Sequence, residues 1–107
     1  MEKKLEKQIL DIVNAIPFGK VTTYGEIAEV IGMKSSARIV GWILNANRDK
    51  MEIPFHRVVN RNGELTGKLH FATPTLMKEL LISEGITFIG EAVNMSVHLW
   101  KPKKVDI

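Results

Sequence analysis

The sequence of 107 residues contains no cysteine. Disulfide bonds, zinc sites built from cysteine and thiol nucleophiles are therefore excluded. The three histidines lack the repeated spacing of metal ligands, so we expect no metal site and no cofactor. No stretch approaches the roughly 20 apolar residues of a membrane-spanning helix, and the first residues lack the apolar core of a signal peptide. We therefore expect no membrane association and a cytoplasmic location.

The length and composition are typical of one small folded domain. A chain of 107 residues with 45% hydrophobic and 25% charged residues can bury one modest core. We therefore expect a single domain over residues 1–107, acting as a monomer. The formal net charge of +3 is lower than that of proteins that coat DNA nonspecifically, so charge alone is a weak indication of a nucleic-acid partner.

Apolar spacing and capping residues predict helices in the first half of the chain. Between Leu5 and Ile16 the apolar residues recur at helical spacing and form one face of an amphipathic helix. Thr23 and Glu26 have the T-x-x-E spacing of a capping box, so Thr23 is the predicted N-cap of a second helix. Gly32 is expected to end that helix.

A third helix is predicted to begin after Ser35 or Ser36 and to run to about residue 45. Two short helices separated by a turn that contains glycine form a helix-turn-helix pattern, whose second helix enters a groove of DNA. Ala37 and Gly41 are small and allow close backbone approach. Arg38 stands in the first turn, where the helix dipole disfavours a cation. Such a cation is either solvated or used in binding.

The stretch from Pro54 to Val59 joins a rigid turn to a short strand. Pro54 fixes its own φ, and the β-branched pair Val58 and Val59 indicates a buried strand. Phe55 and His56 are therefore held on a stiff bend from which side chains can meet a ligand. The alternative is that Phe55 belongs to the core and His56 satisfies a carbonyl.

A turn and a helix are predicted next. An Asn-Gly pair at residues 62–63 indicates a tight turn, after which residues 64–66 are expected to pair with the strand at Val58. Pro74 is the predicted first residue of another helix, and Gly85 is expected to end it.

Apolar and polar residues alternate along residues 93–99. That period of two predicts a half-buried strand, antiparallel to a segment near residues 86–89. The predicted fold class is therefore α+β: a mostly helical single domain with a winged-helix-like helix-turn-helix and small strand pairs.

Four motifs that follow one another along the chain identify a protein family more specifically than any of these patterns alone. They are residues 16–28 (IPFGKVTTYGEIA), 37–41 (ARIVG), 54–59 (PFHRVV) and 80–85 (LLISEG). Together they resemble the C-terminal DNA-binding domain of O6-alkylguanine-DNA alkyltransferases, from about residue 9 to residue 89. The third motif corresponds to that family's Pro-Cys-His-Arg-Val active-site sequence.

Phe55 stands where that family carries its acceptor cysteine. A phenyl ring cannot act as a nucleophile, and no cysteine is available elsewhere. The chain thus resembles the alkyltransferase-like proteins, which bind alkylated guanine without repairing it, and residues 97–102 also resemble the end of those proteins. The resemblance implies a protein that is not an enzyme. It would bind O6-alkylguanine in double-stranded DNA by base flipping and flag it for nucleotide excision repair, with damage-recognition proteins of that pathway as partners.

The resemblance also implies which residues contact DNA. Tyr24 would press against the 3′ phosphate of the target nucleotide and help to rotate it out of the helix. Arg38 would fill the vacated space, with Ala37 and Gly41 beside it on the recognition helix. Asn47 would support the binding channel.

The implied lesion pocket lies around the Pro54 turn. His56, Arg57 and Val58 would line or brace it, and Glu84 would pair with His56 in a structural role. Lys68 would lie over the flipped base. The full predicted set is Phe55, His56, Arg57, Val58, Lys68 and Glu84.

Two other functions are compatible with the residues. A sequence-specific transcriptional regulator could use the same helix-turn-helix, and a hydrolase could use His56 together with Glu84. Binding that depends on the lesion and not on the surrounding sequence would distinguish a lesion-binding protein from a regulator. The hydrolase lacks an obvious nucleophile near His56.

Overall fold

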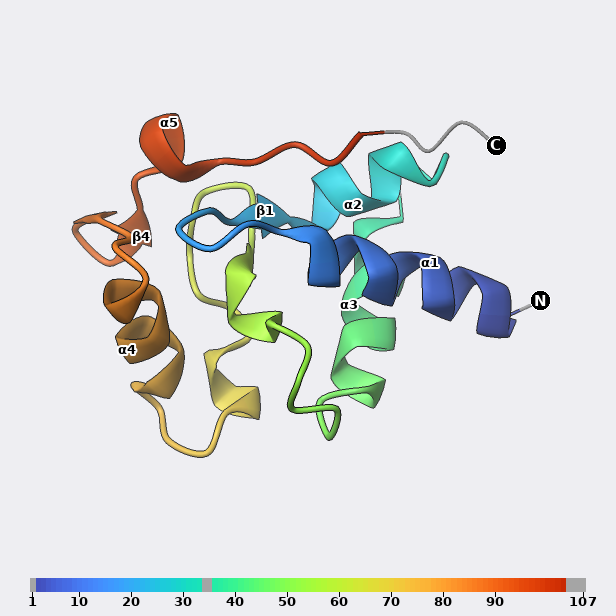
Figure 1. Ribbon diagram of the computed structural model, residues 1–107, viewed down its shortest axis with the longest axis horizontal. Coiled ribbons are helices and arrows are strands. Elements are labelled where there is room, and N and C mark those ends of the chain that lie inside the picture. Colours follow the sequence, from blue (N-terminus) through green and yellow to red (C-terminus); the bar gives the residue numbers. More distant parts are fainter. Residues whose placement is uncertain (1, 34–35, 104–107) are drawn as a thin grey trace.

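The computed structural model describes residues 2–33 and 36–103, and in them the chain forms short helices and two pairs of very short strands (Figure 1). The predicted fold class, a mostly helical α+β domain, is confirmed. None of the helices in the described residues is long and apolar enough to cross a membrane. In chain order the elements are α1 (Glu2–Ala15), β1 (Thr22–Thr23), α2 (Tyr24–Val30), α3 (Ala37–Ala46), the 3₁₀-helix η1 (Phe55–Arg57), β2 (Val58–Val59), the 3₁₀-helix η2 (Lys68–His70), α4 (Leu76–Ser83), β3 (Phe88–Ile89), β4 (Ala92–Val93) and α5 (Met95–His98).

The predicted amphipathic helix is α1. Its apolar face is buried, with Ile9 and Val13 fully inaccessible to solvent and Ile16 nearly so just after the helix ends. In Figure 1 α1 lies across α3, and the two helices are in contact. The helix forms because one continuous apolar stripe can be buried against its neighbours.

The second and third predicted helices are α2 and α3, which pack against each other. Thr23 is the N-cap of α2, as predicted: its Oγ1 accepts a hydrogen bond from the Glu26 amide at 3.0 Å. Gly32 has a φ of +80°, a value that suits glycine and lets the chain turn after α2. Ser36 is the N-cap residue of α3, but its side chain makes no capping hydrogen bond. The alternative cap, Ser35, lies outside the described residues.

The predicted partner of the Val58–Val59 strand was wrong. β2 pairs in parallel with β1, with Thr22 opposite Val58, and not with residues 64–66. The reason lies in the turn, where Asn60 Oδ1 accepts hydrogen bonds from the amides of Asn62 (3.0 Å) and Glu64 (2.8 Å). These bonds close the loop on itself, so residues 64–66 do not extend into a ladder.

The predicted strand over residues 93–99 was wrong beyond Val93. β3 and β4 form the expected antiparallel pair, with Phe88 opposite Val93. The chain then forms α5, in which His98 is buried and its Nε2 lies 3.0 Å from the Thr87 amide that donates to it. This hydrogen bond requires His98 to turn inwards, which an alternating strand would not allow.

The fourth predicted helix begins two residues later than expected. Pro74 lies in the turn before α4, and Thr75 is the N-cap residue. Gly85 follows the helix with a φ of +86°, so its predicted end is confirmed.

The hydrophobic core consists of two clusters that meet at β2. One lies among α1, α2, α3 and η1, and the other lies under α4 and the β3–β4 pair. The β1–β2 pair connects them, since Val58 belongs to the first cluster and Val59 to the second. The segment after α5 returns to β1, where the Trp100 amide donates to the Val21 carbonyl at 2.7 Å (Figure 1).

We predict that Gly63→Ala strongly destabilises the protein. Gly63 has a φ of +81° and a Cβ added there would lie 2.6 Å from the Val93 carbonyl oxygen. The left-handed conformation costs an L-residue about 1–2 kcal/mol, and the steric overlap should add about 1–3 kcal/mol. Urea denaturation of the variant and the parent measures the change in the free energy of unfolding.

Gly32→Ala is the matched control for this prediction. Gly32 also has a positive φ, but nothing lies within 4 Å of its added Cβ. Only the conformational cost should then appear. Equal losses in the two variants would contradict the close packing of the turn at Gly63 against β4.

Candidate nucleic-acid interface

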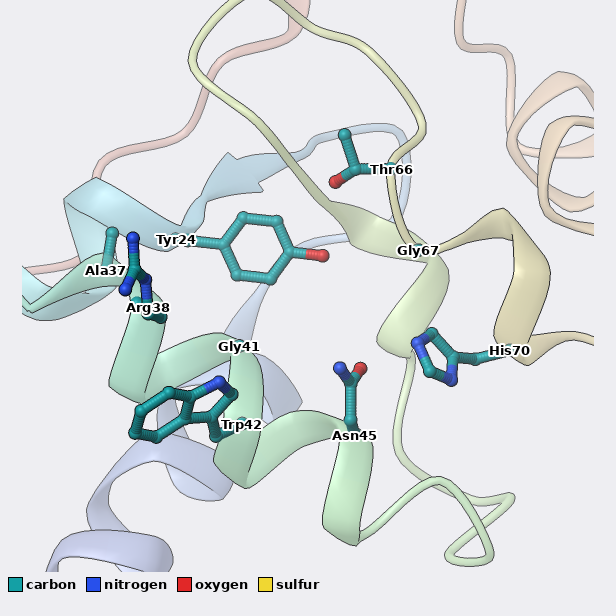
Figure 2. Close-up of a pocket in the computed structure, with 9 residues that line it drawn as sticks. All are labelled: Tyr24, Ala37, Arg38, Gly41, Trp42, Asn45, Thr66, Gly67 and His70. Carbon is teal, nitrogen blue, oxygen red and sulfur yellow. The ribbon is translucent and has the colours of Figure 1, made fainter.

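An open hollow with a volume of about 350 Å³ lies between the α2–α3 pair and the loop that leads into η2 (Figure 2). Four of the residues predicted to bind DNA line it: Tyr24, Ala37, Arg38 and Gly41. They come from the start of α2 and the first half of α3, so the predicted grouping of these side chains is present. The remaining lining residues are Trp42, Asn45, Thr66, Gly67 and His70.

The Tyr24 ring forms one wall of the hollow. Its hydroxyl points toward Gly67 (Figure 2), and a Cβ built on Gly67 would lie 3.4 Å from that oxygen. On the side of α3, a Cβ at Gly41 would lie 3.9 Å from two ring carbons of Tyr24. The Tyr24 ring therefore lies against α3 at Gly41.

Arg38 and Trp42 lie one turn apart along α3 beside the hollow (Figure 2). Both side chains are exposed, and Trp42 retains 63% of its accessible surface. None of the ion pairs in the described part of the chain involves Arg38. A long cation and a large aromatic ring are thus available to a partner along this helix.

Phe55 is part of the core, with 5% of its surface exposed. One face of its ring is covered by Arg48, whose Cζ lies 5.1 Å from the ring centroid. The same guanidinium lies 5.7 Å from the Phe71 centroid and donates to Asn45 Oδ1 through Nε (3.3 Å) and Nη2 (3.1 Å). Arg48 therefore touches both Phe55 and Asn45, one of the lining residues of the hollow.

Sequence reasoning missed Arg48, Asn45, Thr66 and His70. All four lie in segments that read as polar loop or as the end of a helix, and nothing in their local spacing separates them from solvated residues. Their common position depends on how the loop before η2 folds back over α3.

The carboxylate of Glu84 lies at the centre of a nearly buried polar network. It accepts hydrogen bonds from Arg57 Nε (2.8 Å) and Arg57 Nη2 (2.9 Å), and it lies 2.6 Å from His56 Nε2. Arg57 also donates to the Ile16 carbonyl at 2.9 Å. The predicted contact between Glu84 and His56 is therefore present, and Arg57 adds a second and bidentate partner.

The environment of Glu84 changes its acidity. Burial tends to raise the pKa of Glu84, but the hydrogen bonds and charges of Arg57 and His56 outweigh burial and hold that pKa below its ordinary value. The ionised carboxylate is thus the form that the folded protein favours. None of the three side chains lines the hollow, so the network braces η1 from behind.

Three further predicted site residues also lie away from the hollow. Val58 is buried in β2. Asn47, at the end of α3, is buried and donates to Glu6 Oε2 and to the Ile43 carbonyl, both at 2.8 Å, so it links α3 to α1. Lys68 is exposed in η2 and lines a second hollow, on the side of α4. Its role over a flipped base stays a prediction.

Comparison with known proteins gives a family match over most of the chain. Residues 4–86 match the family model for the DNA-binding domain of 6-O-methylguanine DNA methyltransferase. The chain is 38% identical to alkyltransferase-like protein 1 of Schizosaccharomyces pombe, over 89% of this chain and 93% of that one. It is 36% identical to the DNA base-flipping protein of Escherichia coli, over 92% and 81% of the two chains.

Solved structures give the same result. The chain is similar to S. pombe Atl1 in complex with damaged DNA containing O6-carboxymethylguanine, with a TM-score of 0.78, 33% identity, and coverage of 94% of this chain and 97% of that one. It is also similar to Mycobacterium tuberculosis OGT in complex with DNA, with a TM-score of 0.65 and 32% identity over 75% of this chain and 48% of that one.

We predict that Glu84→Gln lowers the free energy of unfolding by about 3–5 kcal/mol at neutral pH, because it leaves the largely buried guanidinium of Arg57 without its carboxylate. The pKa of Glu84 lies below its ordinary value of 4.5, so its contribution to stability is complete above that pH. The contribution is lost as the pH falls through the lowered pKa. Urea denaturation at neutral and acidic pH should therefore show the parent and the variant converging on acidification.

Glu91→Gln is the control. Glu91 is exposed and pairs with Lys78 at 3.3 Å, and surface pairs of this kind contribute about 0–1 kcal/mol. A loss in Glu84→Gln no larger than that in Glu91→Gln would show that the network does not brace the fold.

Proposed function

Because this chain belongs to the alkyltransferase-like proteins, relatives of the DNA-binding domain of 6-O-methylguanine DNA methyltransferases, we propose that it binds O6-alkylguanine in double-stranded DNA. Binding turns the damaged base out of the helix, and no alkyl group is transferred. The observation that carries this proposal is the hollow, which Tyr24 and Arg38 border at the start of α2 and α3.

The docking geometry follows from α2 and α3, which act as a helix-turn-helix. In that motif the N-terminal residues of the second helix enter a groove of DNA. Ala37 and Arg38 occupy this position in α3, and the small side chains of Ala37 and Gly41 allow the DNA to approach closely. Tyr24, whose ring forms one wall of the hollow, contacts the phosphate beside the target nucleotide.

Arg38 supplies the side chain that replaces the flipped base. Turning a base out of the duplex costs a few kcal/mol, and less when the base is damaged and pairs poorly. Arg38 is exposed and enters none of the ion pairs of the described residues, so little is lost when it moves into the stack. Phosphate contacts offset the remaining cost.

The absence of alkyl transfer follows from the chemistry of the residues. The thiol position of the relatives is occupied by Phe55 in the Pro54 turn, and the chain has no cysteine. His56 and Glu84 remain, but they serve the network that holds Arg57. The S. pombe relative has been solved on DNA that contains O6-carboxymethylguanine, which supports an alkylated guanine as the ligand of this chain.

A protein that binds a lesion and cannot remove it needs a downstream process. We propose that this protein acts as a monomer in the cytoplasm and flags the lesion for nucleotide excision repair, whose damage-recognition proteins are its partners. A sequence-specific regulator is the alternative use of the same helix pair. The two functions differ in whether affinity follows the lesion or the surrounding sequence.

We predict that the protein binds a duplex with one O6-methylguanine more tightly than the same duplex with guanine, by about tenfold or more. The damaged base pairs poorly, so flipping costs less, and each additional buried CH₂ gains about 0.8 kcal/mol. Titration of labelled duplexes that differ only in the O6 substituent measures the preference.

The control for this prediction is the same lesion placed in several unrelated sequences. Equal dissociation constants for damaged and undamaged DNA, with strong dependence on sequence, would favour the regulator.

We predict that Arg38→Ala weakens binding to lesion duplex by about 1–3 kcal/mol, because nothing then fills the space that the base leaves. Tyr24→Ala should weaken binding as well. Arg61→Ala is the control for the loss of one positive charge, since Arg61 is exposed in the turn before Gly63 and does not line the hollow. If Arg38→Ala and Tyr24→Ala bind lesion duplex as tightly as Arg61→Ala does, the base-flipping proposal is wrong.

A further inference from the structure

Arg48 occupies an unusual position between the hollow and the aromatic core. It follows α3 directly, and its guanidinium lies over the rings of Phe55 and Phe71, at 5.1 Å and 5.7 Å from their centroids. A Cβ built on Gly67, a lining residue, would lie 3.0 Å from Arg48 Nη2 and 3.4 Å from the Tyr24 hydroxyl. Arg48 therefore lies directly behind Gly67 in the wall of the hollow, and the absence of a side chain at Gly67 leaves room for it.

The hydrogen bonds of this cation are incomplete. Nε and Nη2 share one acceptor, Asn45 Oδ1, and Nη1 is buried without any hydrogen-bond partner. Within residues 4–33 and 36–103 no carboxylate forms an ion pair with Arg48. Burial lowers the pKa of Arg48 from its ordinary value, and Tyr24 beside it opposes that shift. Arginine starts so far above neutrality that the group stays cationic.

A half-buried cation with an unpaired donor destabilises a protein unless another group supplies the acceptor. Apolar side chains of similar length would fill the same space over Phe55 without that cost. The free donor at Arg48 Nη1 thus indicates an acceptor that arrives with a ligand.

We propose that Arg48 reads the flipped base, by donating hydrogen bonds to acceptor atoms of the purine that enters the hollow. This inference rests on the proposed function and names the residue that gives it base specificity. The guanidinium fork matches the O6 and N7 acceptors of guanine, whereas adenine presents an amino donor at the corresponding position. Alkylation at O6 leaves N7 as an acceptor.

The location of Arg48 favours a base over a phosphate as its ligand. Phosphates lie on the outside of the duplex and meet exposed cations, of which Arg38 is the one on the rim of the hollow. Arg48 lies deeper, with its charge between two aromatic rings. Only a group that leaves the helical stack can reach it, and a flipped base is such a group.

The test compares Arg48→Met with the parent on three duplexes that differ at one position. The position carries O6-methylguanine, guanine, or an abasic site, which keeps the phosphates and has no base to read. Arg48→Met should bind the O6-methylguanine duplex about tenfold more weakly and the other two duplexes as the parent does. Its affinity should fall with salt as steeply as that of the parent, because no phosphate contact has been removed.

Arg61→Met provides the matched control, since it makes the same change at an exposed arginine outside the hollow. The melting temperature of Arg48→Met should equal or exceed that of the parent, because a buried unpaired donor is removed. If Arg48→Met does not fold, Arg48→Gln gives the same comparison with a shorter side chain that does not reach the base.

Several outcomes would overturn the inference. Unchanged or tighter binding of Arg48→Met to the lesion duplex would mean that Arg48 only fills the space over Phe55. Equal weakening on all three duplexes would mean a phosphate contact. If the parent itself does not distinguish O6-methylguanine from guanine, the proposed function fails and the role of Arg48 fails with it. If the parent distinguishes them and Arg48→Met does so equally, only the role of Arg48 fails.

Discussion

One nearly buried carboxylate, that of Glu84, holds three distant parts of the chain together. It accepts two hydrogen bonds from Arg57 and lies within hydrogen-bond distance of His56, both in η1. Arg57 also donates a hydrogen bond to the Ile16 carbonyl at the end of α1. Because Glu84 directly follows α4, the network links η1 to α4 through side chains and reaches the end of α1 through the Ile16 carbonyl. The Pro54 turn and the Phe55 ring are positioned by this constraint together with the parallel β1–β2 pair.

The cations around the hollow differ in their surroundings, and this difference suits different tasks. Arg38 is exposed on the first turn of α3, where water stabilises its charge and the side chain is free to move. Arg48 is half-buried over aromatic rings and held by Asn45, so its position is set before any ligand arrives. A mobile outer cation suits insertion into a base stack, and a fixed inner one suits hydrogen bonding to a single base.

Local signals predicted the elements whose stability is local. The T-x-x-E pattern at Thr23 located the start of α2, and the apolar stripe from Leu5 to Ile16 located α1, because a cap or a stripe depends on residues within a few positions. Strand pairing was harder to predict from the sequence. Val58–Val59 was recognised as a strand, yet its partner at Thr22–Thr23 lies more than thirty residues away in sequence and pairs in parallel. The period of two after Val93 was overridden by the hydrogen bond of His98 to Thr87.

The sequence alone was sufficient to exclude one kind of chemistry and to predict which side chains lie together on one helix. The absence of cysteine excludes a thiol acceptor whatever the fold, and Ala37, Arg38 and Gly41 lie together because helical spacing places them so. The tertiary structure alone decided which loop residues join them. The loop before η2 packs over α3, which brings His70 to the hollow, whereas Lys68 lines the second hollow on the side of α4. The chain after α3 places the Arg48 guanidinium over the Phe55 ring. The physical reason is that such positions depend on contacts between segments distant in sequence, which no local pattern records.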